Sequence, residues 1–318
     1  MVFGYLPIDK LGELKNVSSL SFARSHYKPE TNTGSVTSQG DATLKADVAR
    51  TTYSVTGASV NVGVLSDSYN KLEGEAAGIA SGDLPAAGVQ VLLEFGAGAS
   101  DEGRAMAEII HDVAPGAAVA FNPAFNGEAG FAQGIINLAA AGCRVIVDDI
   151  IYSAEPFFQD GIVAQAVDQV VNTNSVTYFS SAGNRVRASY QAPYKNGGTY
   201  TNAALYGAGT GPLPTHDFGT GDNLQNIIIP SGQRLWLSFQ WDNPFQSVSG
   251  GTGATTDLDI LILNSTTGAV LSSAGTVNQS GGGDPVEITG SLRNSSSGPI
   301  NVNVIIVKRS GPDPGLIK

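Results

Sequence analysis

The sequence predicts an α/β domain built on a parallel β-sheet flanked by helices, together with an all-β sandwich module that is inserted in it or appended to it. Two patterns predict this class. Between residues 60 and 181, short apolar runs alternate with segments of helical periodicity, as in the crossover units of parallel sheets. After about residue 215, short strand-like runs follow one another between Gly, Ser, Asn and Pro clusters, which is typical of antiparallel sandwiches.

The elements of the α/β part follow from these runs. Apolar runs predict five buried strands at residues 61–66, 89–95, 117–123, 144–150 and 175–181. Amphipathic periodicity predicts helices at 102–113, 128–141 and 160–171. In parallel sheets, functional residues collect where the strands end and the loops begin, so the residues that follow these runs are the first candidates for a site.

Composition and charge limit the classes of function. The chain has 28 acidic and 17 basic residues and a formal charge of −11, which argues against a nucleic-acid partner. No run approaches the roughly 18 apolar residues of a membrane helix.

Forty glycines favour an extracellular or cell-surface protein. No signal peptide is visible, so either the protein is intracellular or the sequence begins downstream of a removed segment. Nothing in the sequence indicates the oligomeric state.

Three polar residues stand where chemistry is expected. Asp67 follows the first strand, although a lone Asp there is more often a loop former. Glu102 opens the helix at 102–113, where an acidic residue is also favoured by capping and by the helix dipole. Asn184 ends the small-residue stretch SSAGN, where an amide suits a developing oxyanion and a plain turn is equally consistent.

Together these segments resemble the subtilase superfamily of subtilisin-like serine peptidases. VGVLSDS matches the family's V-x-V-x-D-S strand at Asp67, and SSAGN matches its A-A-G-N oxyanion motif at Asn184. EGRAMA stands where the family has H-G-T-x-x-A, so Glu102 takes the place of the catalytic His. The resemblance covers roughly residues 50–190 and implies a subtilisin-like fold, a peptide or protein substrate and Asp67, Glu102 and Asn184 as catalytic residues.

The Glu in place of His is similar to the sedolisin branch, in which a Glu is the general base. Glu102 precedes Ala114-Pro115-Gly116-Ala117, as in that branch, but the partner Asp one turn later is replaced by Met106. A Glu placed against another carboxylate in a dry cleft would share a proton and have its apparent pKa raised. We therefore expect any activity to be greatest at acidic to mildly acidic pH.

No Gly-Thr-Ser motif, in which subtilases carry the nucleophile, occurs in the 318 residues. We expect the nucleophilic Ser beyond Lys318. The function implied is a serine endopeptidase that works through an acyl-enzyme, and this chain alone is expected to be inactive. The alternative is a non-catalytic protein, adhesive or structural, built on a decayed peptidase scaffold. The His-to-Glu change favours the alternative, and the matches at Asp67 and Asn184 favour the enzyme.

The resemblance also suggests a division of the chain. Residues 1–40 are expected to be propeptide-like or an N-terminal extension, 41–214 the partial catalytic domain, and 215–312 the sandwich, similar to the jelly-roll-like modules of bacterial subtilases. Asp148, Asp149 and Tyr152 stand where the family lines its substrate cleft, and the two acidic residues favour basic side chains in the substrate.

No cofactor is required by these motifs, and none of them predicts a metal at the catalytic residues. Structural calcium is an open alternative at Asp257 and Asp259 of TDLDILI, which alternate onto one face of a strand. A solvated strand face is the more common meaning of that pattern.

Overall fold

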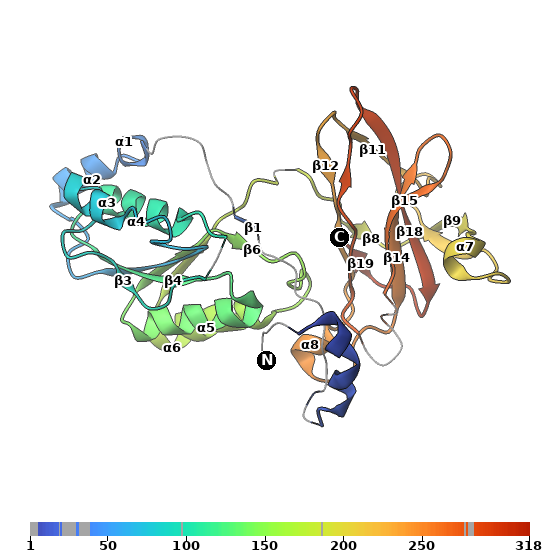
Figure 1. The fold of residues 1–318 in the computed structure, drawn as a ribbon, viewed down its shortest axis with the longest axis horizontal. Helices are drawn as coiled ribbons and strands as arrows, with labels where there is room; N and C mark the ends of the chain where they lie inside the picture. The colour runs from blue at the N-terminus through green and yellow to red at the C-terminus, as the bar shows by residue number, and fades with distance from the viewer. Residues whose placement is uncertain are drawn as a thin grey trace. The chain divides into compact units, whose positions relative to one another are not determined.

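A computed structural model describes residues 6–18, 20, 30–31, 39–96, 98–185, 187–276, 278 and 283–318. The chain divides into two compact units (Figure 1). The first consists of Met1–Leu14, Ser25–Tyr152 and Gly161–Val186, and the second of Lys15–Arg24, Ser153–Asp160 and Arg187–Lys318. Most of the expected N-terminal extension, 1–40, lies outside the described residues; its described part includes a 3₁₀ helix, η1 (Ile8–Asn16).

The first unit alternates strands and helices along the chain. Its elements are β1 (Glu30–Thr31), α1 (Gly40–Thr43), α2 (Ala46–Tyr53), β2 (Asn61–Ser66), α3 (Glu75–Ser81), β3 (Gln90–Val91), α4 (Glu102–Val113), β4 (Ala118–Pro123), α5 (Gly127–Ala140), β5 (Val145–Asp148), β6 (Ile150–Ile151), α6 (Ile162–Asn174) and β7 (Thr177–Ser180). The five predicted strands and three predicted helices are confirmed. The strand expected at 89–95 is shortened to Gln90–Val91.

Five of these strands form one sheet in the order β3-β4-β2-β5-β7, and every pairing in it is parallel. Successive residues of a strand point to opposite faces of its sheet. Val64 of β2 accordingly packs with α4, through Ala107, and Leu65 packs with α5, through Ile135 and Leu138. Figure 1 shows α3 and α4 over one face of the sheet and α5 and α6 over the other. The predicted α/β class, a parallel sheet flanked by helices, is therefore confirmed.

The second unit consists mainly of antiparallel strands. Its elements are β8 (Ala192–Pro193), β9 (Asn196–Tyr200), α7 (Ala203–Tyr206), β10 (Leu213–His216), β11 (Gln225–Ile229), β12 (Arg234–Leu235), β13 (Ser238–Gln240), α8 (Gln246–Ser249), β14 (Asp257–Asn264), β15 (Val270–Ala274), β16 (Val286–Ile288), β17 (Leu292–Arg293), β18 (Ile300–Ser310) and β19 (Leu316–Ile317). The main sheet has the order β15-β14-β18-β10-β9, with β11 also paired to β18.

The core of the second unit joins this main sheet to shorter strands. Leu258 and Ile260 of β14 pack with Phe239 and Trp241, which lie on and beside β13, and with Ile317 of β19. Trp241 is fully buried. These side chains come from distant parts of the segment, so this cluster joins strands that are far apart in the sequence.

The expected boundary at residues 214 and 215 falls inside this unit. β10 pairs with β18 in the main sheet, and β9 pairs with β10, so the β part begins near residue 187. The stretch before residue 215 has few large apolar residues, and two of its strands, β8 and β10, pair with strands near the end of the chain.

Two further findings concern expectations from the sequence. Asp257 and Asp259 do not lie on a solvated strand face, because each is only 3% exposed. Their carboxyl groups are enclosed by segments that lie far from β14 in the sequence, which alternation within one strand does not reveal.

Within the described residues, no helix is both long enough and apolar enough to cross a membrane.

Candidate functional site

The carboxyl edge of the parallel sheet brings the candidate residues together. Leu65 of β2 is in register with Asp148 of β5, which is in register with Ser180 of β7. Asp67 and Asp149 therefore leave the sheet at neighbouring positions on the same edge. Residues that follow parallel strands at such an edge are the usual location of a binding or catalytic site in α/β sheets.

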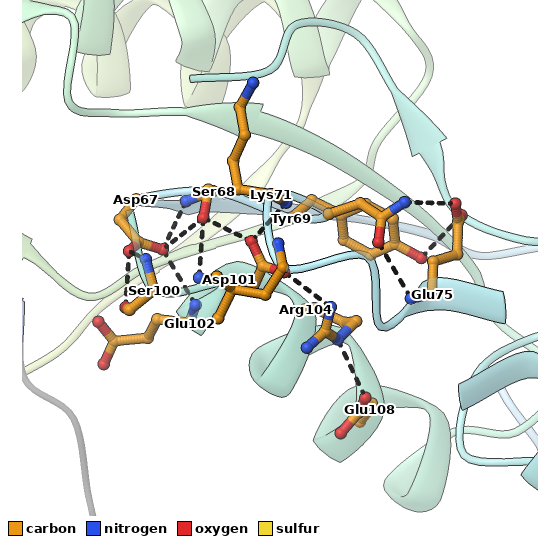
Figure 2. A network of polar contacts seen from close by, with 12 residues as sticks. Asp67, Ser68, Tyr69, Lys71, Glu75, Ser100, Asp101, Glu102, Arg104 and Glu108 are labelled. Atoms are coloured by element: carbon orange, nitrogen blue, oxygen red, sulfur yellow. Dashed lines mark hydrogen bonds and ion pairs between the residues drawn. The ribbon is translucent and has the colours of Figure 1, made fainter. Parts of the chain in front are cut away.

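Asp67 is 2% exposed and holds the start of α4 in place. Its Oδ1 accepts hydrogen bonds from the backbone N–H of Ser68 at 2.5 Å and of Glu102 at 3.0 Å (Figure 2). Its Oδ2 accepts from the Ser100 hydroxyl at 2.6 Å and from the Ser100 backbone N–H. The first turn of a helix has N–H groups without helical partners, and Asp67 satisfies one of them. Asp67 thus fixes Glu102 through its backbone.

A second carboxylate, Asp101, ties the same turn to the loop after β2. It accepts hydrogen bonds from the backbone N–H groups of Lys71 at 2.7 Å and Leu72 at 2.8 Å, and from the Ser68 hydroxyl at 2.8 Å. Arg104 Nη1 lies 2.7 Å from its Oδ2. Burial raises the pKa of Asp101, but these hydrogen bonds and the guanidinium outweigh it and leave the pKa lowered. The ionised carboxylate therefore locks the loop against α4.

Gly103 lets α4 approach this loop closely. Its backbone N–H donates to the Ser68 carbonyl at 3.0 Å. A Cβ at this position would lie 2.4 Å from Phe121 Cε2 and 2.7 Å from the Ser68 carbonyl oxygen. Only glycine fits there without displacement of the backbone. This close approach explains why a glycine follows Glu102 in the EGRAMA motif.

The central feature of the site is a carboxyl pair formed by Glu102 and Asp149. Each residue is 8% exposed, and the negative charge of Glu102 acts on the carboxyl group of Asp149. Burial raises the pKa of Asp149 well above its usual range, and the negative charge of Glu102 raises it further, while the Ser66 hydroxyl lowers it. Two buried carboxyl groups in contact hold a proton between them rather than ionising together. The pair can therefore accept and donate a proton.

The sequence did not reveal this pairing. The sequence predicts that Asp149 contacts substrate, and the resemblance to sedolisins puts the partner of Glu102 one turn along the helix, where Met106 stands. Met106 instead packs in the apolar cluster between α4 and the sheet, which includes Val64. The signal that identifies Asp149 is the parallel register, because it places the residue after β5 beside the end of β2.

Two of the predicted substrate-contacting residues face the interior. Asp148 is 3% exposed and accepts a hydrogen bond from the Ser180 hydroxyl at 2.9 Å; burial raises its pKa, against the effect of hydrogen bonds that include one from Tyr178. The Tyr152 hydroxyl donates to the Ala124 carbonyl at 2.6 Å, and this residue is 2% exposed. Both side chains support the edge of the sheet from within and do not present a surface to a substrate.

Asn184 lies in the exposed segment that follows β7, four residues beyond Ser180. Gly183 before it has φ +73°, a conformation that glycine adopts readily. The backbone N–H of Ser181 donates to the Asp148 carbonyl at 3.1 Å and holds the start of this segment against β5. Asn184 therefore belongs to the same edge of the sheet as the carboxyl pair.

The described residues contain no group of three His, Cys, Asp or Glu side chains arranged to hold a metal ion. At the edge of the parallel sheet, the carboxylates of Asp67 and Asp101 instead accept hydrogen bonds from backbone N–H groups and hydroxyls. The arrangement there suits proton transfer by carboxyl groups.

No protein-family model matches the sequence, and neither does any curated protein. Among solved structures, the chain is similar to MycP1 from Mycobacterium smegmatis, with 16% identity and a TM-score of 0.36 over 54% of this chain and 53% of that one. It is also similar to the Clostridium perfringens CspB protease, with 10% identity and a TM-score of 0.42 over 87% and 66%. The chain thus spans about half the length of MycP1. TM-scores this low add nothing to the case for the site, which stands on its own geometry.

Proposed function

We propose that this chain forms the greater part of a serine-type endopeptidase of the subtilase superfamily, extracellular or at the cell surface, whose nucleophilic serine lies beyond Lys318. The observation that carries the proposal is the buried Glu102–Asp149 carboxyl pair at the carboxyl edge of the parallel sheet. The motif resemblance puts a catalytic base at Glu102, and a buried carboxyl partner is what such a base requires.

In the proposed reaction, the serine hydroxyl oxygen attacks the carbonyl carbon of a peptide bond, and its proton passes to Glu102. The tetrahedral intermediate collapses as the proton moves to the departing amine nitrogen, which leaves an acyl-enzyme. Water then attacks the ester in the same way and restores the serine. Asp149 retains the second proton of the pair, so that one carboxylate at a time is charged in the buried space.

Two residues support this chemistry without accepting the proton. Asp67 is a positioning residue, because it binds the Glu102 backbone N–H and both donors of Ser100. The motif resemblance implied Asp67 as a catalytic residue, and the contact of Asp67 with Glu102 is through the Glu102 backbone. Asn184 supplies the amide that donates to the developing oxyanion.

The test uses the polypeptide with the residues that follow Lys318, assayed for hydrolysis of an unfolded, fluorescently labelled protein. Glu102→Gln keeps the shape of the side chain but removes the base, so we expect a loss of about 100-fold or more in kcat. The matched control is Glu108→Gln on the same helix, whose carboxylate lies 3.6 Å from Arg104; it should keep nearly full activity.

The pH profile separates this site from a histidine-based one. We expect a maximum at acidic to mildly acidic pH, and Asp149→Asn should remove any alkaline limb that comes from the pair, because the amide cannot lose the proton that Asp149 retains. A maximum at or above pH 8 contradicts the proposed base. Absence of hydrolysis at every pH, with no Gly-Thr-Ser segment after Lys318, would favour the non-catalytic alternative.

A further inference from the structure

The edge strand β9 is held on the antiparallel sheet by few contacts of its own. It ends the order β15-β14-β18-β10-β9, and its strand partner among the described residues is β10. Its residues are exposed or half-buried, and they include Gly197 and Gly198, which have no side chain to pack. Its apolar contact with the core is made by Tyr200, at its far end. The near end of β9 therefore depends on the contacts made just before it.

Those contacts centre on His216, the last residue of β10, which is fully buried. The register of β9 and β10 shifts between Thr215 and His216, so that His216 stands opposite Asn196, the first residue of β9. The Lys195 backbone N–H donates to His216 Nδ1 at 3.3 Å. The Asp217 backbone N–H donates to the Lys195 carbonyl at 2.8 Å. The start of β9 is thus bound through both polar groups of one peptide residue, and the imidazole supplies one of the acceptors.

The surroundings of the ring assign its neutral form. Nε2 lies 3.0 Å from the Tyr190 hydroxyl. Because Nδ1 accepts from an N–H, the proton of the neutral ring is on Nε2, which donates to the Tyr190 oxygen. Three aromatic rings pack around the imidazole, with centroids 4.9 Å away for Phe218, 5.4 Å for Tyr194 and 5.9 Å for Tyr190. Both nitrogens of the neutral ring are therefore satisfied.

Charged groups near the imidazole act in both directions. The negative charge of Asp217 favours the protonated ring, and the positive charge of Lys195 disfavours it. On β18, which pairs with β10, Lys308 lies over the Tyr194 ring and forms an ion pair with Asp313. Burial raises the pKa of both neighbouring tyrosines, so their hydroxyls stay protonated. Burial also has the largest effect on the imidazole, and it lowers the pKa of that ring.

We propose that His216 is an acid-sensitive latch, which holds the start of β9 on the sheet and releases it when the imidazole is protonated. The second proton goes to Nδ1, where it faces the Lys195 N–H, so the hydrogen bond is replaced by two opposed donors. A charged ring among buried aromatic side chains is unfavourable, and opening of the strand returns it to water. The residues of the latch belong to the antiparallel unit, so the proposal does not depend on the proposed catalysis.

The sign of the pH effect follows from proton uptake. The closed strand holds His216 neutral, and the open strand lets it take up a proton at the usual pKa of about 6.5. The contribution of the latch is therefore fully present above about pH 6.5 and is lost as the pH falls toward the lowered pKa of the closed form. Opening of β9 should become more frequent by up to about tenfold for each pH unit in that interval.

The test is hydrogen exchange of the backbone amides of residues 187–200, measured by mass spectrometry between pH 7 and pH 5 and corrected for the intrinsic effect of pH. Carboxylates with ordinary pKa values keep their charge in this range. We expect exchange in 187–200 to increase as the pH falls, while β14 in the interior of the sheet stays protected. An NMR titration of the three histidine rings should show His216 titrating below the usual range.

Two variants isolate the latch. His216→Asn offers an acceptor oxygen that does not titrate, so exchange in 187–200 should no longer depend on pH. The matched control is His111→Asn, on α4 of the first unit, which should behave as the parent does. If His216→Asn fails to fold, the parent still decides, because its exchange must start to rise at the pH at which the His216 ring titrates.

Three results would overturn the proposal. The first is exchange in 187–200 that is no faster at pH 5 than at pH 7. The second is an equal increase in the parent and in His216→Asn, which would assign the effect to another group. The third is an increase that includes β14 to the same extent, which would indicate unfolding of the whole unit rather than release of its edge strand.

Discussion

Asp67 and Asp149 are the same residue type at the same edge of the sheet, but their surroundings give them different roles. Asp67 accepts hydrogen bonds from the backbone of Ser68, Ser100 and Glu102 and from the Ser100 hydroxyl. Asp149 faces the carboxyl group of Glu102. Several donors hold the carboxyl group of Asp67 in one orientation, whereas a buried carboxyl group beside another one retains a proton. Asp67 therefore positions the start of α4, and Asp149 takes part in proton exchange.

Replacement of Asp67 tests its positioning role. Asp67→Ala leaves the backbone N–H groups of Ser100 and Glu102 without their acceptor and should lower the free energy of unfolding by about 1–3 kcal/mol. Asp67→Asn keeps one acceptor oxygen and should cost less. Urea unfolding followed by circular dichroism measures both. The exposed Asp168→Asn, on α6, is the control; equal losses in all three variants would contradict the role.

Among the elements, α4 carries the site, and its position depends on its first turn. Asp67 binds the N–H of Glu102, Asp101 binds the loop after β2, and Gly103 lies against Ser68. The apolar face of the helix, which includes Ala107 and Ile110, packs on the sheet at the same time. A helix fixed at both its end and its face presents Glu102 in one orientation, which a general base needs.

Gly103→Ala separates steric fit from helix propensity. Alanine has a higher helix propensity than glycine, and this difference alone would stabilise the helix by about 1 kcal/mol. The added Cβ, however, would lie 2.7 Å from the Ser68 carbonyl oxygen, so we expect a net loss of about 1–3 kcal/mol in the free energy of unfolding. Ala105→Gly, at an exposed position of α4, is the counterpart and should lose about 1 kcal/mol from propensity. A gain in stability for Gly103→Ala would contradict the close packing.

Considered as a whole, the molecule carries a formal charge of −11 and buries carboxyl groups in both units. Glu102 and Asp149 lie in the first, and Asp259 and Glu287 in the second. Burial raises the pKa of Asp149, Asp259 and Glu287. A group whose folded pKa is raised stabilises the fold below its unfolded pKa and loses that contribution as the pH rises through its folded pKa.

The stability of the chain should therefore fall as the pH rises from 7 to 8, because the pKa of Glu287 is raised from 4.5 to about 8. The slope is about 1.4 kcal/mol per pH unit for each proton retained by the folded chain. Thermal unfolding in matched buffers measures it. Glu287→Gln and Asp149→Asn should each flatten the slope, and Asp168→Asn should not. Stability that rises over this interval would contradict the raised pKa values of Glu287 and Asp149.

The sequence by itself determined the elements whose cause is local. Helical periodicity and an acidic first turn marked residues 102–113, and α4 is found at Glu102–Val113. Apolar runs likewise located β2 and β4 and the α/β class, because burial of a strand or of a helix face leaves its period in the chain. The same local motif placed Asp67 and Glu102 at the edge of the sheet.

Only the tertiary structure decided which distant residues meet. The contact of Glu102 with Asp149 arises from the register of β2 with β5. The burial of Asp259 beside Glu287 arises from the packing of β14 near β16. Strands β9 and β10 join the antiparallel unit through β18. In each case the partner lies far along the chain, and a periodic pattern records that a side chain is buried but not which side chain it faces.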